Sequence, residues 1–371
     1  EINDAITAQL ARLDHSTFLG LTHEPGIRLA EELLRVAPTG LSKVFFAGDG
    51  SSAAEAAIKM AYQAAAQRGE DRPLYVHCAE GYHGDTLGAV SLGGVELFHA
   101  TYRPLLIETR MVGSPGVLKP GQTRAARAAE VLDEMRALLA REGSRVCAIV
   151  VEPLVQAAGG MLTHDPAFLR GVRELCDSSG AAMLVDEVAT GIGATGRWFA
   201  CEHAGVSPDL MVVGKRVTGG VLPLSAVLTT DAVYEPFLGD AASGRTFFHG
   251  HTFTANPICC AASLANLALM HARGTVARAA EVGERLGAGL ASIGTYDGVA
   301  EIRRVGTMTG VEVQSVGERT GFAVCRAARR RGVLIRPLGD VVVLMPPLGI
   351  SDDELDELVG VVDESIREVV Q

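Results

Sequence analysis

Residues 181–215, AAMLVDEVATGIGATGRWFACEHAGVSPDLMVVGK, contain two short apolar runs, and each run leads into a charged residue. The first run, 183–185, is followed by Asp186 and Glu187, and the second, 210–213, is followed by Gly214 and Lys215. Short apolar runs bounded by glycine or polar residues are typical of buried parallel strands. Because open α/β sheets bind ligands at the C-terminal ends of their strands, we predict an active site that contains Asp186 and Lys215.

Lys215 stands out because lysine is rare in this chain. Only Lys43, Lys59, Lys119 and Lys215 are present, and the first three have polar or helical neighbours. An amine in apolar surroundings is a nucleophile that can form a Schiff base with a carbonyl group. The alternative is a structural lysine at a strand end whose ammonium group extends into a loop.

Length and composition indicate a globular α/β protein. The 371 residues are 48% hydrophobic, which is enough for one large domain and one smaller one. A formal net charge of −11 argues against nucleic acid as a partner. No apolar run approaches the length of a membrane span, so we expect no membrane partner.

Seven cysteines form no CxxC pair, and most lie in apolar runs. We interpret them as buried free thiols of a cytoplasmic protein, and we expect no metal. The chain opens at Glu1 without a methionine, and we expect a further N-terminal segment to precede it.

The order of the segments predicts two domains. Strands alternate with helices from residue 43 to 230, which is typical of a mainly parallel sheet with helices on both faces. From residue 275 the pattern changes to an α+β unit whose last helix starts with a Ser-x-x-Glu box at 351–354. We therefore predict a large domain at 16–274, a small α+β domain at 275–371, and residues 1–15 as the remnant of an N-terminal segment.

A phosphate-binding turn is predicted at 48–55, GDGSSAAE, which follows a strand at 43–47. Ser52 and Glu55 have the spacing of a capping box, so we expect a helix to begin there. The free N–H groups and the dipole at a helix start attract anions, which makes Gly50 and Ser51 candidate phosphate ligands. The alternative is a structural Gly-Ser turn of the kind that many α/β proteins contain.

An aromatic residue follows the next strand, in GYHGDT at 81–86. Tyr82 and His83 are placed where a flat side chain could stack on a flat cofactor. The alternative is an aromatic side chain that packs beneath a loop. A phosphate site, an aromatic plate, the carboxylate of Asp186 and the amine of Lys215 together match what pyridoxal phosphate requires. We therefore predict pyridoxal 5'-phosphate as the cofactor, with Lys215 also moving the substrate proton.

These motifs resemble those of the class III aminotransferases, in the family's order and over nearly the whole chain. The resemblance rests on GDGSSAAE at 48–55, GYHGDT at 81–86, VDEVATG at 185–191, GK at 214–215, TGGVLPL at 218–224, HGHTF at 249–253 and IRP at 335–337. It implies an α/β fold of type I: a large domain with a mainly parallel sheet flanked by helices, and a smaller α+β domain. It also implies a homodimer with shared active sites.

The resemblance assigns a role to each matching residue. Gly50 and Ser51 would bind the cofactor phosphate, and Tyr82 would stack on the ring and contact substrate. Asp186 would pair with the pyridine nitrogen, and Lys215 would hold the cofactor covalently.

Two further residues take their roles from the resemblance alone. Thr252 would reach the phosphate bound by the neighbouring subunit, and Arg336 would hold a substrate carboxylate, for which a guanidinium is well suited. The structural alternative for Arg336 is an arginine at a domain interface. Glu152 and Glu187 are interpreted as supporting residues.

The implied reaction takes an amino group from a small-molecule amine donor to a keto acceptor. The motifs are most similar to members that use S-adenosylmethionine and 8-amino-7-oxononanoate in biotin synthesis. Ala194, where the family usually has arginine, and Arg216, where a small or apolar residue is common, leave open a specialised member that uses lysine or another ω-amine. The same residues would also serve an isomerisation of one amine by this cofactor, and a binding protein without cofactor is the interpretation from a different functional class.

Overall fold

The computed structural model describes residues 1–370 of the chain. Seven strands form the large sheet: β1 (Leu41–Ala47), β2 (Leu74–Cys78), β3 (Thr109–Val112), β4 (Val146–Val151), β7 (Ala182–Asp186), β8 (Leu210–Val213) and β9 (Ser225–Thr230). Their order across the sheet is β1-β9-β8-β7-β4-β2-β3. The sheet is mainly parallel, as predicted, because β3, β2, β4, β7 and β8 all pair in parallel.

Strand β9 departs from the parallel pattern, since it pairs antiparallel with both β8 and β1. Only residues 214–224 connect β8 to β9, and they contain the short 3-10 turn Lys215–Thr218 instead of a crossover helix. A parallel connection needs a dozen or more residues and usually a helix, so the short connection reverses the chain direction. The same short connection holds Lys215.

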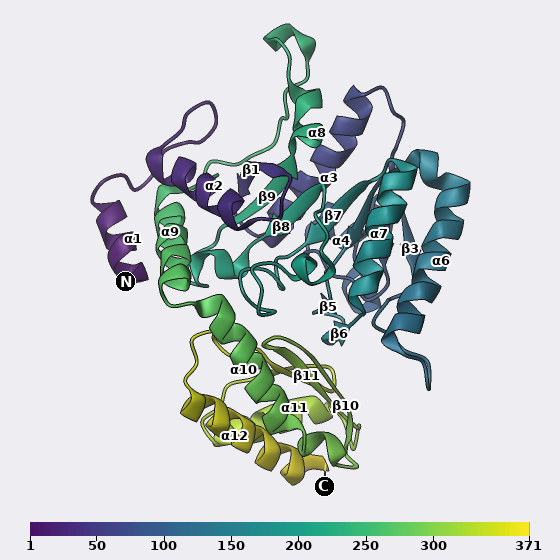
Figure 1. Ribbon diagram of the computed structural model, residues 1–371, viewed down its shortest axis with the longest axis vertical. Helices are drawn as coiled ribbons and strands as arrows, with labels where there is room; N and C mark the ends of the chain where they lie inside the picture. Colours follow the sequence, from purple (N-terminus) through teal and green to yellow (C-terminus); the bar gives the residue numbers. More distant parts are fainter. Residues whose placement is uncertain (371) are drawn as a thin grey trace.

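Helices cover both faces of the large sheet. They are α2 (Glu24–Val36), α3 (Gly50–Gln67), α6 (Arg124–Glu142), α7 (Pro166–Ser179) and α9 (Pro257–Ala272). Alternate strand residues point to opposite faces. Leu184 and Val212 belong to the core that α3 covers, whereas Val185 and Met211 belong to the core beneath α2, α6, α7 and α9. The result is a three-layer α/β architecture, confirmed as predicted (Figure 1).

The second sheet is antiparallel and has four strands: β10 (Val299–Val305), β11 (Met308–Val313), β12 (Arg336–Leu338) and β13 (Val341–Leu344). Three helices pack with it around a separate core: α10 (Thr275–Leu290), α11 (Thr320–Arg330) and α12 (Asp352–Val370). Figure 1 shows this unit below the large sheet, where α10 continues from α9. We propose residue 275, the first of α10, as the start of the small domain.

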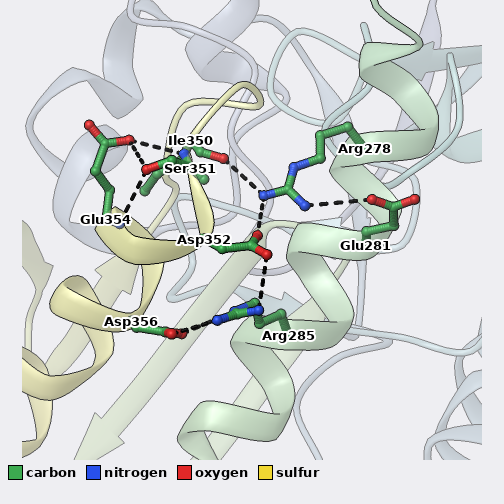
Figure 2. Close-up of polar contacts among 8 residues, drawn as sticks. All are labelled: Arg278, Glu281, Arg285, Ile350, Ser351, Asp352, Glu354 and Asp356. Atoms are coloured by element: carbon green, nitrogen blue, oxygen red, sulfur yellow. Dashed lines mark hydrogen bonds and ion pairs between the residues drawn. The ribbon is translucent and has the colours of Figure 1, made fainter.

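Charged contacts join α10 to the start of α12 (Figure 2). Arg278 and Arg285 both pair with Asp352, and Arg278 also donates to the carbonyl oxygen of Ile350. The Ser-x-x-Glu box at 351–354 is confirmed, because the N–H and hydroxyl of Ser351 both bond the carboxylate of Glu354. These contacts fix the 345–350 loop, which lines the cleft described below.

The remaining elements are short or peripheral. They are α1 (Ile2–Leu10), α4 (Leu87–Ser91), α5 (Glu96–His99), α8 (Asp231–Tyr234), the hairpin β5 (Val155–Gln156) with β6 (Leu162–Thr163), and several 3-10 turns, of which η4 (Lys215–Thr218) matters most here. All seven cysteines are buried and unpaired, as predicted. Within residues 1–370, no helix combines the length and the apolar character that crossing a membrane requires.

Candidate active site

Asp186 and Lys215 come from the ends of two adjacent parallel strands. Asp186 is the last residue of β7 and lies opposite Val212 of β8. Lys215 follows Val212 by three residues, so the two charged residues lie at the same C-terminal edge of the sheet. Both line one cleft. The C-terminal edge of the parallel strands therefore holds a carboxylate and an amine together, as the sequence led us to expect.

The backbone of Lys215 has an unusual conformation. Its φ of +45° lies in the left-handed region, which costs about 1–2 kcal/mol for a residue with a Cβ atom. Asn266 of α9 holds the following turn, since its Nδ2 donates to the carbonyl oxygens of Arg216 (2.9 Å) and Val217 (3.2 Å). Backbone strain of this kind concentrates at functional sites. The sequence led us to expect the Lys215 amine in apolar surroundings, whereas its side chain is exposed within the open cleft.

The cleft lies between the two sheets and has a volume of about 1900 Å³. Its large-sheet wall comes from the loops after β1, β2, β7 and β8, and its opposite wall comes from β12, β13 and the 345–350 loop. Candidate residues that line it are Gly50, Ser51, Tyr82, Asp186, Lys215 and Arg336. A space of this size can hold a cofactor and a substrate at once.

Asp186 is buried and held on both carboxylate oxygens. Oδ2 lies 2.8 Å from Nδ1 of His83, and Oδ1 accepts a hydrogen bond from the backbone N–H of Val188 (2.9 Å). Burial opposes charging of His83, but the hydrogen bond and the charge of Asp186 outweigh it and raise the pKa of His83. His83 is thus a buried partner of the carboxylate and not a ring that stacks on a cofactor.

The predicted phosphate turn sits at the start of α3. The cap is Asp49, not Ser52, because the carboxylate of Asp49 accepts from the N–H (2.9 Å) and hydroxyl (3.1 Å) of Ser52. Glu55 instead accepts from the N–H of Gly88 (2.7 Å) at the start of α4. Gly50 and Ser51 are the first two residues of the 18-residue helix, so their N–H groups have no acceptor within it.

Close packing places this helix start beside the strand ends. A Cβ atom on Gly50 would lie 2.9 Å from Val188, two residues after Asp186. Gly84 has a φ of +132°, and a Cβ atom there would lie 2.1 Å from the hydroxyl of Ser51. Only glycine fits at these two positions without displacing a neighbour. The start of α3 therefore lies beside the loop that follows Asp186, and Gly50 and Ser51 line the cleft.

Tyr82 is half-buried at the cleft wall. Its ring meets Phe98 edge-on at a centroid distance of 5.6 Å. Burial, and then the hydrogen bond with Asp85, raises the pKa of the Tyr82 phenol to about 12. The backbone N–H of Tyr82 donates to the carboxylate of Glu152 (3.1 Å), which fixes the loop that carries the ring.

Glu152 and Glu187 are both buried acids that support loops of the site. Glu152 accepts from the N–H groups of Tyr82 and Ala157, and burial raises its pKa to about 7. Glu187 accepts from the hydroxyl of Thr190 (2.6 Å) and the N–H of Cys201 (2.9 Å) and does not line the cleft. Both contacts agree with the supporting role that we inferred from the sequence.

Of the remaining residues that the sequence singled out, Arg336 lines the cleft, whereas Thr252 and Ala194 do not. Arg336 is the first residue of β12, is exposed in the cleft, and has no ion-pair partner among residues 1–370. Thr252 is exposed but does not line the cleft of its own chain. Ala194 is fully buried, and its carbonyl oxygen accepts from the N–H and hydroxyl of Thr307 (both 3.0 Å), so it also lies outside the cleft wall.

Comparison with known proteins identifies the family. The profile of the class III aminotransferases matches residues 1–366. A relative from Nitratidesulfovibrio vulgaris, named adenosylmethionine-8-amino-7-oxononanoate aminotransferase, is 45% identical over 384 aligned residues, which cover 100% of this chain and 71% of that protein. The chain belongs to the class III aminotransferases.

Solved structures of class III aminotransferases and other transaminases share the fold. The crystal structure of the adenosylmethionine-8-amino-7-oxononanoate aminotransferase from Methanocaldococcus jannaschii has a TM-score of 0.93 and 34% identity, covering 100% of this chain and 85% of that one. An amine transaminase from an uncultivated Pseudomonas species, in its pyridoxal-phosphate-bound form, has a TM-score of 0.93 and 30% identity, covering 99% of this chain and 86% of that one. The protein is therefore a pyridoxal-phosphate-dependent aminotransferase of fold type I.

The residues of the cleft fit this cofactor. The free N–H groups at the start of α3 suit a phosphate, and the carboxylate of Asp186 suits a protonated ring nitrogen. Lys215 supplies the amine at the adjacent strand end. When bound, pyridoxal phosphate supplies an aldehyde and a ring that withdraws electrons from the substrate carbon. One cleft of this chain thus brings together the N–H groups, the carboxylate and the amine that pyridoxal phosphate requires.

Proposed function

We propose that this aminotransferase transfers the amino group of S-adenosylmethionine to 8-amino-7-oxononanoate, which yields 7,8-diaminononanoate for biotin synthesis. The observation that carries the proposal is similarity to curated relatives over the whole of this chain. Curated relatives from Nitratidesulfovibrio vulgaris, Geobacter sulfurreducens and Aquifex aeolicus bear the name of this activity at 41–45% identity, and each alignment covers 100% of this chain. The arginines in the cleft also favour substrates with carboxylates.

In the proposed mechanism Lys215 is the general base. Once the substrate amine replaces Lys215 on the cofactor, the freed Nζ would take a proton from the substrate carbon that bears the amine and would give it up again to complete the transfer. Asp186 keeps a positive charge on the ring nitrogen, which stabilises the negative charge that develops at the substrate carbon. The same two residues act in reverse when the amino group passes to the keto acceptor.

The remaining residues of the site position the cofactor and the substrate. Gly50 and Ser51 hold the phosphate, and Tyr82 covers one face of the ring and borders the substrate. Arg336 holds a substrate carboxylate from the small-domain wall. We further propose a cytoplasmic homodimer in which Thr252 of each protomer contacts the phosphate in the partner's site. Its exposed position outside the cleft of its own chain supports this role.

The donor is tested by assay of the holoenzyme with 8-amino-7-oxononanoate and either S-adenosylmethionine or lysine. We expect 7,8-diaminononanoate only, or far faster, with S-adenosylmethionine. Turnover with lysine and none with S-adenosylmethionine would reject the proposed donor. Ala194 gives no support to the lysine alternative, because a fully buried residue outside the cleft wall does not contact substrate.

A further inference from the structure

Arg216, the residue after Lys215, lines the same cleft and has a side chain that is half-buried. Its Nη1 donates to the carbonyl oxygen of Ala189 (2.6 Å). A guanidinium has five N–H donors. Within residues 1–370, the Arg216 side chain makes one hydrogen bond, the one to Ala189. The remaining donors are free to bind a ligand in the cleft.

Arg216 also lacks a counter-charge. Other half-buried or buried arginines of this chain are paired: Arg173 with Asp177 and Asp209, and Arg303 with Glu301 and Glu312. Arg216 forms no ion pair with any of the described residues, although the chain has 44 acidic side chains. Burial lowers the pKa of Arg216, as expected for a cation removed from water without an anion beside it.

The backbone and the side chain of Arg216 are both held in place. Nδ2 of Asn266 bonds its carbonyl oxygen, and the carbonyl oxygen of Ala189 bonds its guanidinium. Ala189 belongs to the loop that leaves β7 after Asp186. A cation that is fixed before ligand arrives binds an anion with little loss of conformational entropy.

We propose that Arg216 binds a substrate carboxylate and is a second carboxylate-binding residue of the cleft, distinct from Arg336. The two arginines belong to opposite walls: Arg216 follows β8 of the large sheet, and Arg336 begins β12 of the small sheet. The inference rests on the proposed function, in which two different carboxylates visit one cleft in turn. One carboxylate is attached to the carbon that carries the amine, and the other ends a long chain.

Binding of heptanoate to the holoenzyme tests this directly, because heptanoate has a carboxylate and an apolar chain but no amine or ketone. Calorimetry would compare the wild type with Arg216→Met, which keeps most of the side-chain volume, and with Arg216→Lys, which keeps the charge. We expect Arg216→Met to raise the Kd about ten-fold or more, the size expected for a hydrogen bond to a charged group. Arg216→Lys should recover part of the loss.

Arg197→Met is the matched control, since Arg197 is exposed and lies outside the cleft wall. It should leave the Kd unchanged. A wild-type Kd in Arg216→Met, or no heptanoate binding by the wild type, would overturn the proposal. Retained cofactor absorbance shows that each variant is folded. This test does not depend on which amine or ketone the enzyme turns over, so failure of the proposed substrates leaves it intact.

Half-reaction kinetics assign the carboxylate. We expect Arg216→Met to raise the KM of S-adenosylmethionine or of 8-amino-7-oxononanoate by about ten-fold or more while kcat changes little. A rise with the first places the donor carboxylate at Arg216, and a rise with the second places the acceptor carboxylate there. Unchanged KM values for both would contradict the proposal.

Discussion

Asp186 and His83 form a buried pair in which carboxylate Oδ2 and imidazole Nδ1 lie 2.8 Å apart. His83 comes from the loop after β2 and Asp186 from the end of β7, so the pair ties together two loops of the cleft. Because Oδ1 also accepts from Val188, the carboxylate has little freedom to rotate. A fixed charge at the strand end is what the proposed role of Asp186 requires.

Replacing Asp186 with Asn removes this charge and keeps the shape of the side chain. We expect kcat to fall by about 100-fold or more, the range seen when a preorganised electrostatic group is removed. Single-turnover kinetics with the donor would measure the change. Asp133→Asn, at an exposed position on α6, is the control and should retain normal kcat. Near-normal kcat in Asp186→Asn would contradict the role of the charge.

The raised pKa of Glu152 predicts that the stability of the protein depends on pH. Burial raises its pKa from 4.5 to about 7, so the folded protein holds a proton that the unfolded chain releases. This stabilisation is complete below pH 4.5 and is lost as the pH rises through about 7. Glu152→Gln cannot ionise, so from about pH 4.5 to pH 8 its unfolding free energy should rise relative to the wild type by at most about 3 kcal/mol.

Denaturant unfolding at several pH values would measure this difference. Glu318→Gln, at an exposed position, is the control and should track the wild type across the range. A constant difference between Glu152→Gln and the wild type would show that Glu152 does not change its protonation on unfolding.

Two substitutions at Tyr82 separate the contribution of its ring to cofactor affinity from that of its phenol oxygen. We expect Tyr82→Phe to keep cofactor affinity, since the ring remains, and Tyr82→Ala to weaken it by about ten-fold, the size of one lost aromatic contact. Titration of the apoenzyme with pyridoxal phosphate, followed by absorbance, gives both values. Equal affinity in the two variants would argue against stacking.

Hybrid dimers test whether Thr252 acts across a subunit interface. A Lys215→Ala protomer paired with a Thr252→Val protomer would assemble one site from Lys215 of the second chain and Thr252 of the first. We therefore expect the mixture to gain activity over the Thr252→Val homodimer once subunits exchange. If Thr252 served its own chain's site, no hybrid site would be intact and mixing would give no gain.

The strand pattern of the sequence predicted much of this site, because the C-terminal ends of parallel strands lie at one edge of the sheet for any conformation of the loops. Local motifs were less reliable. Asp49 and Ser52 are both residue types that cap helices, and Asp49 is the cap, whereas Glu55 accepts from the backbone of α4 instead of completing a capping box with Ser52. The pairing of His83 with Asp186 joins residues 103 positions apart, which no local pattern reports.

The direction of the Arg216 side chain could not be predicted from the sequence either, because Arg216 follows a residue with an irregular backbone conformation. The left-handed conformation of Lys215 sets the path of η4, and with it the direction of Arg216. The connection after β8 is too short for a crossover helix, yet the strand pattern alone did not show that β9 would reverse direction. In both cases a short chain segment between fixed strands decided the outcome.

The central claim is that Lys215 carries the cofactor covalently and Asp186 faces it across the site. Borohydride reduction of the holoenzyme, followed by proteolysis and mass spectrometry, tests it most directly. We predict that the peptide containing Lys215 carries the reduced cofactor and that peptides containing Lys43, Lys59 or Lys119 do not. Labelling of one of those three lysines, or of none of the four, would contradict the account.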